Sequence, residues 1–109
     1  MDQGFIKAAA VTPLVRVADV EYNREQIEKG VEEAAAHGAK IIVFPELCLC
    51  GYTCEDLLLQ DLLLEACKGE LLTLARQCRE IDALIFVGLP VEREGKLYNV
   101  AAALFQYWR

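Results

Sequence analysis

The sequence has no apolar run that approaches the roughly 20 residues of a membrane-spanning helix. Its first residues, MDQGFIK, carry charges and lack the apolar core of a signal peptide. Lys and Arg number only 11 against 17 Asp and Glu, and no stretch concentrates them, whereas nucleic acid binding requires clustered cations. We therefore expect a cytoplasmic protein that binds neither nucleic acid nor a membrane.

The cysteines lack the pattern of a disulfide scaffold, because five is an odd number and no secretion signal accompanies them. Cys48, Cys50 and Cys54 are spaced C-x-C-x₃-C, but a structural zinc site needs four ligands and nothing marks the fourth. Glu46 could activate Cys48 as a nucleophile in principle, yet ordinary packing also brings alternate residues of an extended chain to one face. We therefore expect buried thiols and no metal site.

The length of 109 residues favours a single domain. Hydrophobic residues make up 55% of the chain, a high share for a small domain in which much of the chain lies at the surface. We expect part of this apolar surface to meet a partner or a further length of chain.

Alternating apolar and amphipathic segments predict an α/β fold with right-handed crossovers. In chain order we expect a strand at 5–11, a helix at 19–37, a strand at 40–44, two helices separated at Gly69, a strand at 83–88, and a hairpin with its tip at 94–96.

Particular residues mark the expected element ends. Asp19 is suited to cap the first helix, and Gly38 is suited to end it. Thr53 and Asp56 have the spacing of a capping box, so a helix is expected to begin close to them. Pro90 is expected to turn the chain after the third strand.

The stretch FPELCLCGYTCEDL, residues 44–57, places Glu46 at the end of the second predicted strand. Ligands of open α/β sheets gather at the carboxyl ends of strands. Pro45 restrains the strand end, and the apolar neighbours of Glu46 are expected to desolvate its carboxylate and raise its pKa towards that of a general base. A solvated carboxylate in a polar turn is the plainer alternative, and spacing alone favours it.

The same stretch resembles the first catalytic segment of the nitrilase superfamily of carbon–nitrogen hydrolases, in which F-P-E is followed by G-Y. The extension G-Y-T-C-E-D-L resembles more narrowly the amino-terminal glutaminase domain of the glutamine-dependent NAD synthetases. Further matching segments are I-I-V-F-P-E, L-I-F-V-G-L-P and L-Y-N-V-A-A. The resemblance implies about one half of an α-β-β-α sandwich, with residues 1–109 as the amino-terminal portion of the glutaminase domain.

In that family a Glu, a Lys and a Cys cooperate in hydrolysing the side-chain amide of glutamine. The resemblance implies that Glu46 is the general base and that Tyr52 lines the substrate pocket. The family's Lys and nucleophilic Cys lie downstream of L-Y-N-V-A-A. We therefore expect a truncated fragment that is inactive by itself and belongs to an enzyme.

The resemblance also implies partners and cofactors for the intact protein. Glutamine is the expected small-molecule substrate, and the released ammonia is expected to pass to a synthetase domain that uses ATP and Mg²⁺. No cofactor is expected within residues 1–109, and the protein is expected to be a homo-oligomer. Two alternatives stay open: another amidase or carbamoyl hydrolase of the superfamily, and a non-enzymatic α/β interaction module.

Overall fold

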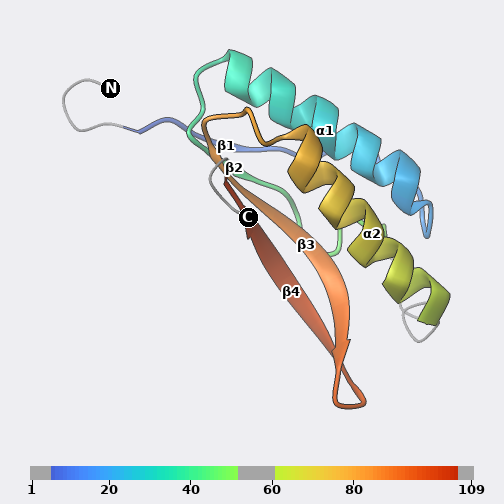
Figure 1. Ribbon diagram of the computed structural model, residues 1–109. Coiled ribbons are helices and arrows are strands. Elements are labelled where there is room, and N and C mark those ends of the chain that lie inside the picture. Colours follow the sequence, from blue (N-terminus) through green and yellow to red (C-terminus); the bar gives the residue numbers. More distant parts are fainter. Residues whose placement is uncertain (1–5, 52–60, 106–109) are drawn as a thin grey trace.

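A four-stranded sheet forms one of the two layers of the computed structural model, which describes residues 6–51 and 61–105 (Figure 1). Across the sheet lie, in this order, β1 (Ala8–Ala10), β2 (Ile41–Val43), β3 (Leu84–Arg93) and β4 (Lys96–Leu104). The first three strands run parallel, and β4 returns antiparallel to β3. The predicted α/β class is confirmed, although β1 and β2 are shorter than the sequence indicates.

The first helix, α1 (Val20–Ala36), begins and ends close to the predicted residues. The carboxylate of Asp19 accepts a hydrogen bond of 3.2 Å from the backbone N–H of Tyr22, which satisfies one of the free donors of the first turn. At the other end Gly38 has a φ of 86°, a left-handed conformation that glycine adopts without strain.

The second helix, α2 (Asp61–Gln77), corrects the prediction of two helices separated at Gly69. Gly69 lies inside this helix, with open space where a side chain would stand. A glycine in a helix interior costs about 1 kcal/mol relative to alanine. Burial offsets this cost, because Leu63, Cys67 and Leu74 have the spacing of one continuous helical face.

β3 continues through Pro90, where the sequence analysis predicts a turn. The carbonyl of Gly88 accepts a hydrogen bond from the N–H of Leu49, in the turn that follows β2, so this side of β3 faces away from β4. Pro90, two residues on, directs its backbone nitrogen to the same side, where the ladder with β2 has already ended. Proline has no N–H to donate, and such an edge position tolerates it.

A tight turn joins β3 to β4 and confirms the predicted hairpin tip. Arg93 pairs with Lys96, and the two residues between them, Glu94 and Gly95, have φ values of 53° and 78°. Positive φ at both central residues matches the right-handed twist of the two strands.

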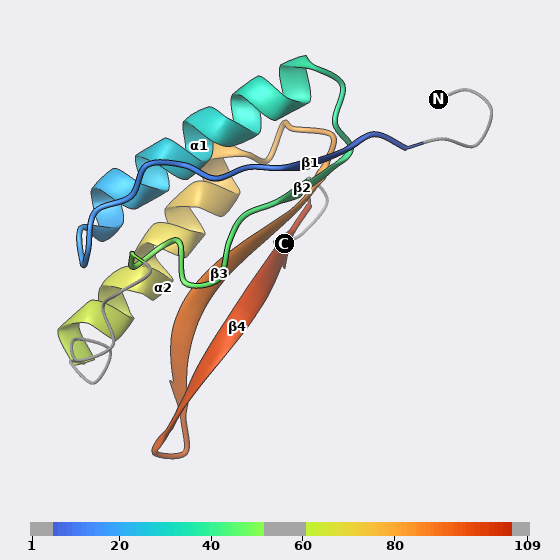
Figure 2. The same ribbon diagram turned by 180° about the vertical axis from the view of Figure 1, so that it is seen from behind.

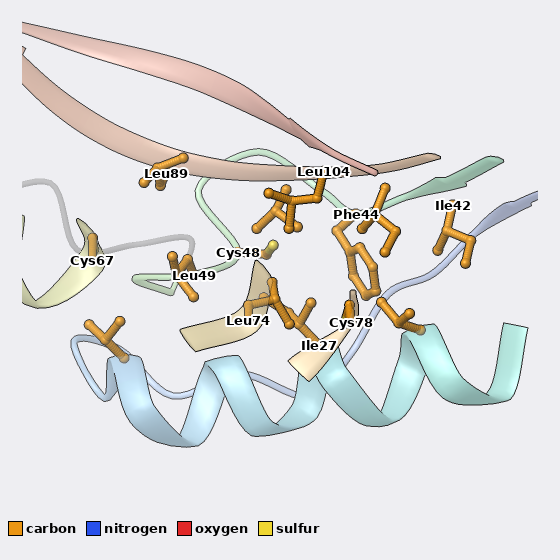
Figure 3. Close-up of a cluster of buried hydrophobic side chains, with 14 of the residues drawn as sticks. Ile27, Ile42, Phe44, Cys48, Leu49, Cys67, Leu74, Cys78, Leu89 and Leu104 are labelled. Atoms are coloured by element: carbon orange, nitrogen blue, oxygen red, sulfur yellow. The ribbon is translucent and has the colours of Figure 1, made fainter. Parts of the chain in front are cut away.

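Both helices cover one face of the sheet, and the paired β3 and β4 extend beyond them as a long ribbon (Figures 1 and 2). The core lies between these two layers. It joins Ile27 of α1 and Leu74 of α2 to Ile42 and Leu89 of the sheet, and all four side chains are almost fully buried (Figure 3).

The opposite face of the sheet is mostly apolar and carries no helix in the described part of the chain. The strand register places on this open face Ala8, Ala10, Ile41, Val43, Leu84, Phe86, Ala101 and Ala103. Val43 keeps 42% of its surface exposed, a large fraction for an apolar residue inside a sheet. This face therefore accounts for part of the exposed apolar surface, to which Leu14, Leu62 and Leu72 contribute elsewhere on the chain. Neither described helix is long and apolar enough to cross a membrane.

Candidate active site

Glu46 lies just beyond the carboxyl end of β2, as the sequence predicts. Phe44 still pairs with β3, because its N–H donates to the carbonyl of Phe86 at 3.0 Å. Pro45, the next residue, directs its nitrogen to the opposite side of the strand, towards β1, and has no N–H to donate there. Glu46 therefore heads the turn of residues 46–51, which directly follows a rigid strand.

This turn is held by its own backbone. The N–H of Cys48 donates to the carbonyl of Pro45 at 3.3 Å, and the N–H groups of Cys50 and Gly51 both donate to the carbonyl of Leu47, at 3.1 and 3.0 Å. Leu47 has a φ of 53°, a left-handed conformation that is uncommon for residues other than glycine. Backbone strain of this kind is concentrated at functional sites, because it persists only where the surroundings enforce it.

Gly88 of β3 lets the turn pack directly against the sheet. A side-chain carbon at this position would stand 2.5 Å from the backbone nitrogen of Leu47, 2.9 Å from the carbonyl oxygen of Pro45 and 3.0 Å from the carbonyl carbon of Glu46. All three are backbone atoms, which have little freedom to move aside. The backbone around Glu46 therefore packs so closely against β3 that only glycine fits at position 88.

Glu46 borders a small cleft of about 150 Å³, together with Phe44, Gly88, Asn99, Val100 and Ala101. Asn99 and Ala101 project from the open face of the sheet, because they pair with Pro90 and Gly88 across the β3–β4 ladder. Small-molecule sites usually enclose roughly 300–1,000 Å³. The cleft is therefore large enough for one part of a site.

The expected apolar shielding of Glu46 is not provided by its neighbours in the described part of the chain, and this corrects the sequence analysis. Glu46 is exposed, whereas Phe44 and Leu49 are buried in the core and Leu47 is half-buried. The physical reason is the turn, which directs these apolar side chains towards the helices and leaves the carboxylate at the surface.

The cysteines are packed as the sequence predicts, since Cys48, Cys50, Cys67 and Cys78 are all buried. Burial raises the pKa of the Cys48 thiol to about 11, although a backbone hydrogen bond with Gly88 partly opposes this shift. Burial also raises the pKa of Cys78 to about 12, with smaller contributions from Glu28 and Glu32. Thiols with such pKa values are almost entirely protonated at neutral pH and are poor nucleophiles.

Tyr52, the predicted substrate-binding residue, lies outside the described residues, as do Cys54 and the capping box of Thr53 and Asp56. Across residues 6–51 and 61–105, no group of three or more His, Cys, Asp or Glu side chains is arranged to hold a metal ion.

Two residues of the site carry no assignment from the sequence analysis. Gly88 has a signal in the sequence, because a glycine inside an apolar strand often marks a close backbone approach. Asn99 has none, since its place beside Glu46 depends on the register of β4 against β3.

The described chain forms a two-layer α/β unit, and the carboxylate of Glu46 lies at the end of an inner strand, β2. The carbon-nitrogen hydrolase family model matches residues 7–107, nearly the whole chain. The chain belongs to the carbon-nitrogen hydrolase family.

Within this family the chain is similar to glutamine-dependent NAD(+) synthetases. It is 33% identical to the enzyme of Mycobacterium leprae over 102 residues, which are 94% of this chain and 15% of that protein. It is 42% identical to the enzyme of Aquifex aeolicus over 88 residues, which are 81% of this chain and 15% of that protein. The chain thus spans only 15% of the length of these curated relatives.

Solved structures show the same relation in three dimensions. The chain superimposes on a glutamine-dependent NAD(+) synthetase of Cytophaga hutchinsonii with a TM-score of 0.85 and 31% identity, covering 93% of this chain and 17% of that one. An amidase of Nesterenkonia sp. matches with a TM-score of 0.76 at 21% identity, covering 94% of this chain and 39% of that one, and shares the fold.

Proposed function

We propose that this chain supplies the Glu46 part of a glutaminase active site in a glutamine-dependent NAD synthetase. In the reaction proposed, a cysteine thiol attacks the amide carbon of glutamine, and the carboxylate of Glu46 takes the thiol proton. Glu46 gives this proton to the leaving nitrogen, so that ammonia departs and a thioester remains. The regenerated carboxylate then takes a proton from the water that hydrolyses the thioester. A lysine stabilises the oxyanion that forms in both steps.

The single observation that carries this proposal is the position in which the packed turn holds Glu46. Its carboxylate stands at the carboxyl end of an inner parallel strand, on a turn packed against Gly88, at the border of a cleft. The restrained backbone supports a role that depends on position, since a general base must lie within hydrogen-bond reach of the proton it accepts. Exposure of Glu46 in these 109 residues is compatible with the role if further chain covers the cleft.

The nucleophile and the oxyanion-stabilising lysine are proposed to come from elsewhere in the intact protein. Among the described residues that line the Glu46 cleft, none is a lysine or a cysteine. The described cysteines are buried, and the pKa values of Cys48 and Cys78 are raised to about 11 and about 12. Residues 1–109 alone should therefore be inactive, because the members of a catalytic triad act as a unit.

The open face of the sheet is proposed to meet the second sheet of an α-β-β-α sandwich. Its apolar residues include Ile41, Val43 and Phe86, which suit the inner face of two packed sheets. The same packing would enlarge the small cleft at Glu46 into a full site. Residues 1–109 would then form the amino-terminal portion of the glutaminase domain, and Tyr52 would line the substrate pocket.

The synthetase activity, the homo-oligomeric state, the cytoplasmic location and the use of ATP and Mg²⁺ stay predictions. A synthetase domain in the same protein is proposed because curated relatives of more than five times this length carry the name NAD synthetase. An amidase of the same family without a synthetase domain is the second candidate, favoured by the fold shared with the Nesterenkonia amidase.

The complete gene product tests both candidates in one assay. Purified protein is supplied with ATP, Mg²⁺ and the deamidated dinucleotide, and both ammonia release and NAD formation are measured with glutamine as the nitrogen source. Both products are expected. Ammonia release without NAD formation favours the amidase, and NAD formation from added ammonia but not from glutamine contradicts the glutaminase role.

A reactive glutamine analogue locates the nucleophile in the same preparation. The label is expected on a cysteine other than those described here. Stoichiometric labelling of Cys48 or Cys78 would contradict the proposal that the nucleophile lies elsewhere in the intact protein.

A further inference from the structure

Asn23 is the one polar residue that is buried among the described residues, with none of its surface exposed. It lies on the face of α1 that otherwise consists of apolar residues, between Val20 and Ile27. A buried amide must find hydrogen-bond partners, because an unpaired one costs free energy that an apolar side chain would not. The partners of Asn23 are therefore informative.

Those partners lie outside the helix, on two loops. The side-chain Oδ1 accepts a hydrogen bond from the backbone N–H of Arg16 at 2.7 Å. The side-chain Nδ2 donates to the carbonyl of Arg16 at 2.7 Å and to the carbonyl of Leu49 at 3.2 Å. Asn23 thus joins the segment that precedes α1 to the turn that carries Glu46.

Leu49 is held from two opposite sides. Its carbonyl accepts from Asn23 of α1, and its N–H donates to the carbonyl of Gly88 of β3 at 3.2 Å. Glu46 lies three residues earlier in the same tight turn, which is closed by the bond from Cys48 to Pro45. A shift of Leu49 therefore moves the backbone that positions the carboxylate.

A second set of contacts joins the same two segments. The N–H of Ala18 donates to the carbonyl of Cys50 at 2.8 Å. Gly51, with a φ of 90°, packs so closely that a side-chain carbon there would lie 2.8 Å from the carbonyl oxygen of Arg16 and from the Cα of Val17. Fixing Arg16 through Asn23 therefore also fixes the surface against which the end of the turn rests.

We propose that Asn23 is a positioning residue for Glu46, an inference that rests on the glutaminase function proposed above. Its amide holds the turn of residues 46–51 between α1 and β3 and so fixes where the carboxylate stands. The residue acts through the turn, since its own side chain is buried and bonds only backbone groups of Arg16 and Leu49.

The test compares three variants of the complete gene product. Asn23→Asp keeps the oxygen that accepts from Arg16 and loses both donated hydrogen bonds. Asn23→Ala removes all three bonds without adding charge, in case the aspartate variant fails to fold. Val31→Ala is the matched control, because Val31 is equally buried on the same helix, is apolar and forms no side-chain hydrogen bond to the turn.

The kcat for glutamine hydrolysis is expected to fall about 10- to 100-fold in the Asn23 variants, with KM changed less than about threefold, because a displaced general base slows chemistry more than binding. Val31→Ala should lower the melting temperature comparably and leave kcat near wild type. Amide hydrogen exchange at residues 48–51 should accelerate in the Asn23 variants and stay unchanged in Val31→Ala.

Two results would overturn the inference: Asn23 variants that keep kcat within twofold of wild type, or an equal fall of kcat in Val31→Ala. If the wild type does not hydrolyse glutamine, the proposed function fails by itself. The amide exchange rates then test separately whether Asn23 positions the turn. Unchanged protection of residues 48–51 in the Asn23 variants would overturn that inference.

Discussion

Substitution of Gly88 tests how strongly the position of Glu46 depends on close packing of its turn against β3. In Gly88→Ala the added carbon would stand 2.5 Å from the nitrogen of Leu47, about 0.9 Å short of ordinary contact, which begins at 3.4 Å. The neighbouring atoms are backbone, so relief requires the turn to retreat rather than a side chain to rotate. Overpacking of this kind costs about 1–3 kcal/mol of stability.

The same shift should reduce activity far more than stability alone explains. A retreat close to 1 Å moves the Glu46 carboxylate away from the proton it accepts, and such misplacement can lower a rate about 100-fold. We expect the complete gene product carrying Gly88→Ala to fold, to unfold at lower urea concentration, and to hydrolyse glutamine about 100-fold more slowly. Urea unfolding and steady-state kinetics measure the two effects.

Gly69→Ala is the matched control, because it makes the same chemical change where a side chain meets open space. Inside α2 it should stabilise the protein by up to about 1 kcal/mol and leave glutamine hydrolysis unchanged. If Gly88→Ala kept wild-type stability and activity, the turn would not depend on close contact with β3, and the account of Glu46 seating would be wrong.

Two further predictions concern stability. The pKa of Cys48 is raised to about 11 from an ordinary 9.0, so the folded state favours the neutral thiol. The contribution of this thiol to the free energy of unfolding is therefore fully present below pH 9 and is lost as pH rises towards 11. The wild type should lose about 2–3 kcal/mol over this range that Cys48→Ala does not lose, since each pKa unit is worth about 1.4 kcal/mol; equal losses in urea unfolding would contradict it. The half-buried pair of Arg24 and Glu70, 2.8 Å apart, joins α1 to α2, whereas the pair of Lys40 and Asp82, 2.9 Å apart, is exposed. Double-mutant cycles should give a coupling of about 1–2 kcal/mol for the first pair and under about 0.5 kcal/mol for the second, and a larger value for the exposed pair would refute the ranking.

Local chemistry made much of the fold predictable from the sequence. Asp19 and Gly38 mark the ends of α1 because capping and left-handed backbone are properties of single residues. The hairpin tip at Glu94 and Gly95 is predictable for the same reason. Glu46 could be placed at a strand end because the apolar run before it stops at a proline.

The errors arose where tertiary contacts outweigh local preference. Gly69 stays in a helix because the segments of α2 before and after it bury one continuous face. Pro90 stays in a strand because its nitrogen faces an edge of β3 that has no paired strand there. The sequence does not predict the exposure of Glu46, because residues adjacent in the chain need not surround each other's side chains in the fold. Asn23 did leave a signal, a polar residue at a buried position of an apolar helical stripe, but its partners 7 and 26 residues away are defined only by the fold.

The role of Glu46 is tested most directly by the kinetics of Glu46→Gln in the complete gene product, which removes the proton acceptor and keeps the shape of the side chain. Glu33→Gln, at an exposed position on α1, is the control for the change of charge. We predict that Glu46→Gln lowers kcat for glutamine hydrolysis by about 10²–10⁴-fold, the usual contribution of a general base, while the control keeps wild-type activity. Near-normal hydrolysis by Glu46→Gln would contradict the proposed mechanism.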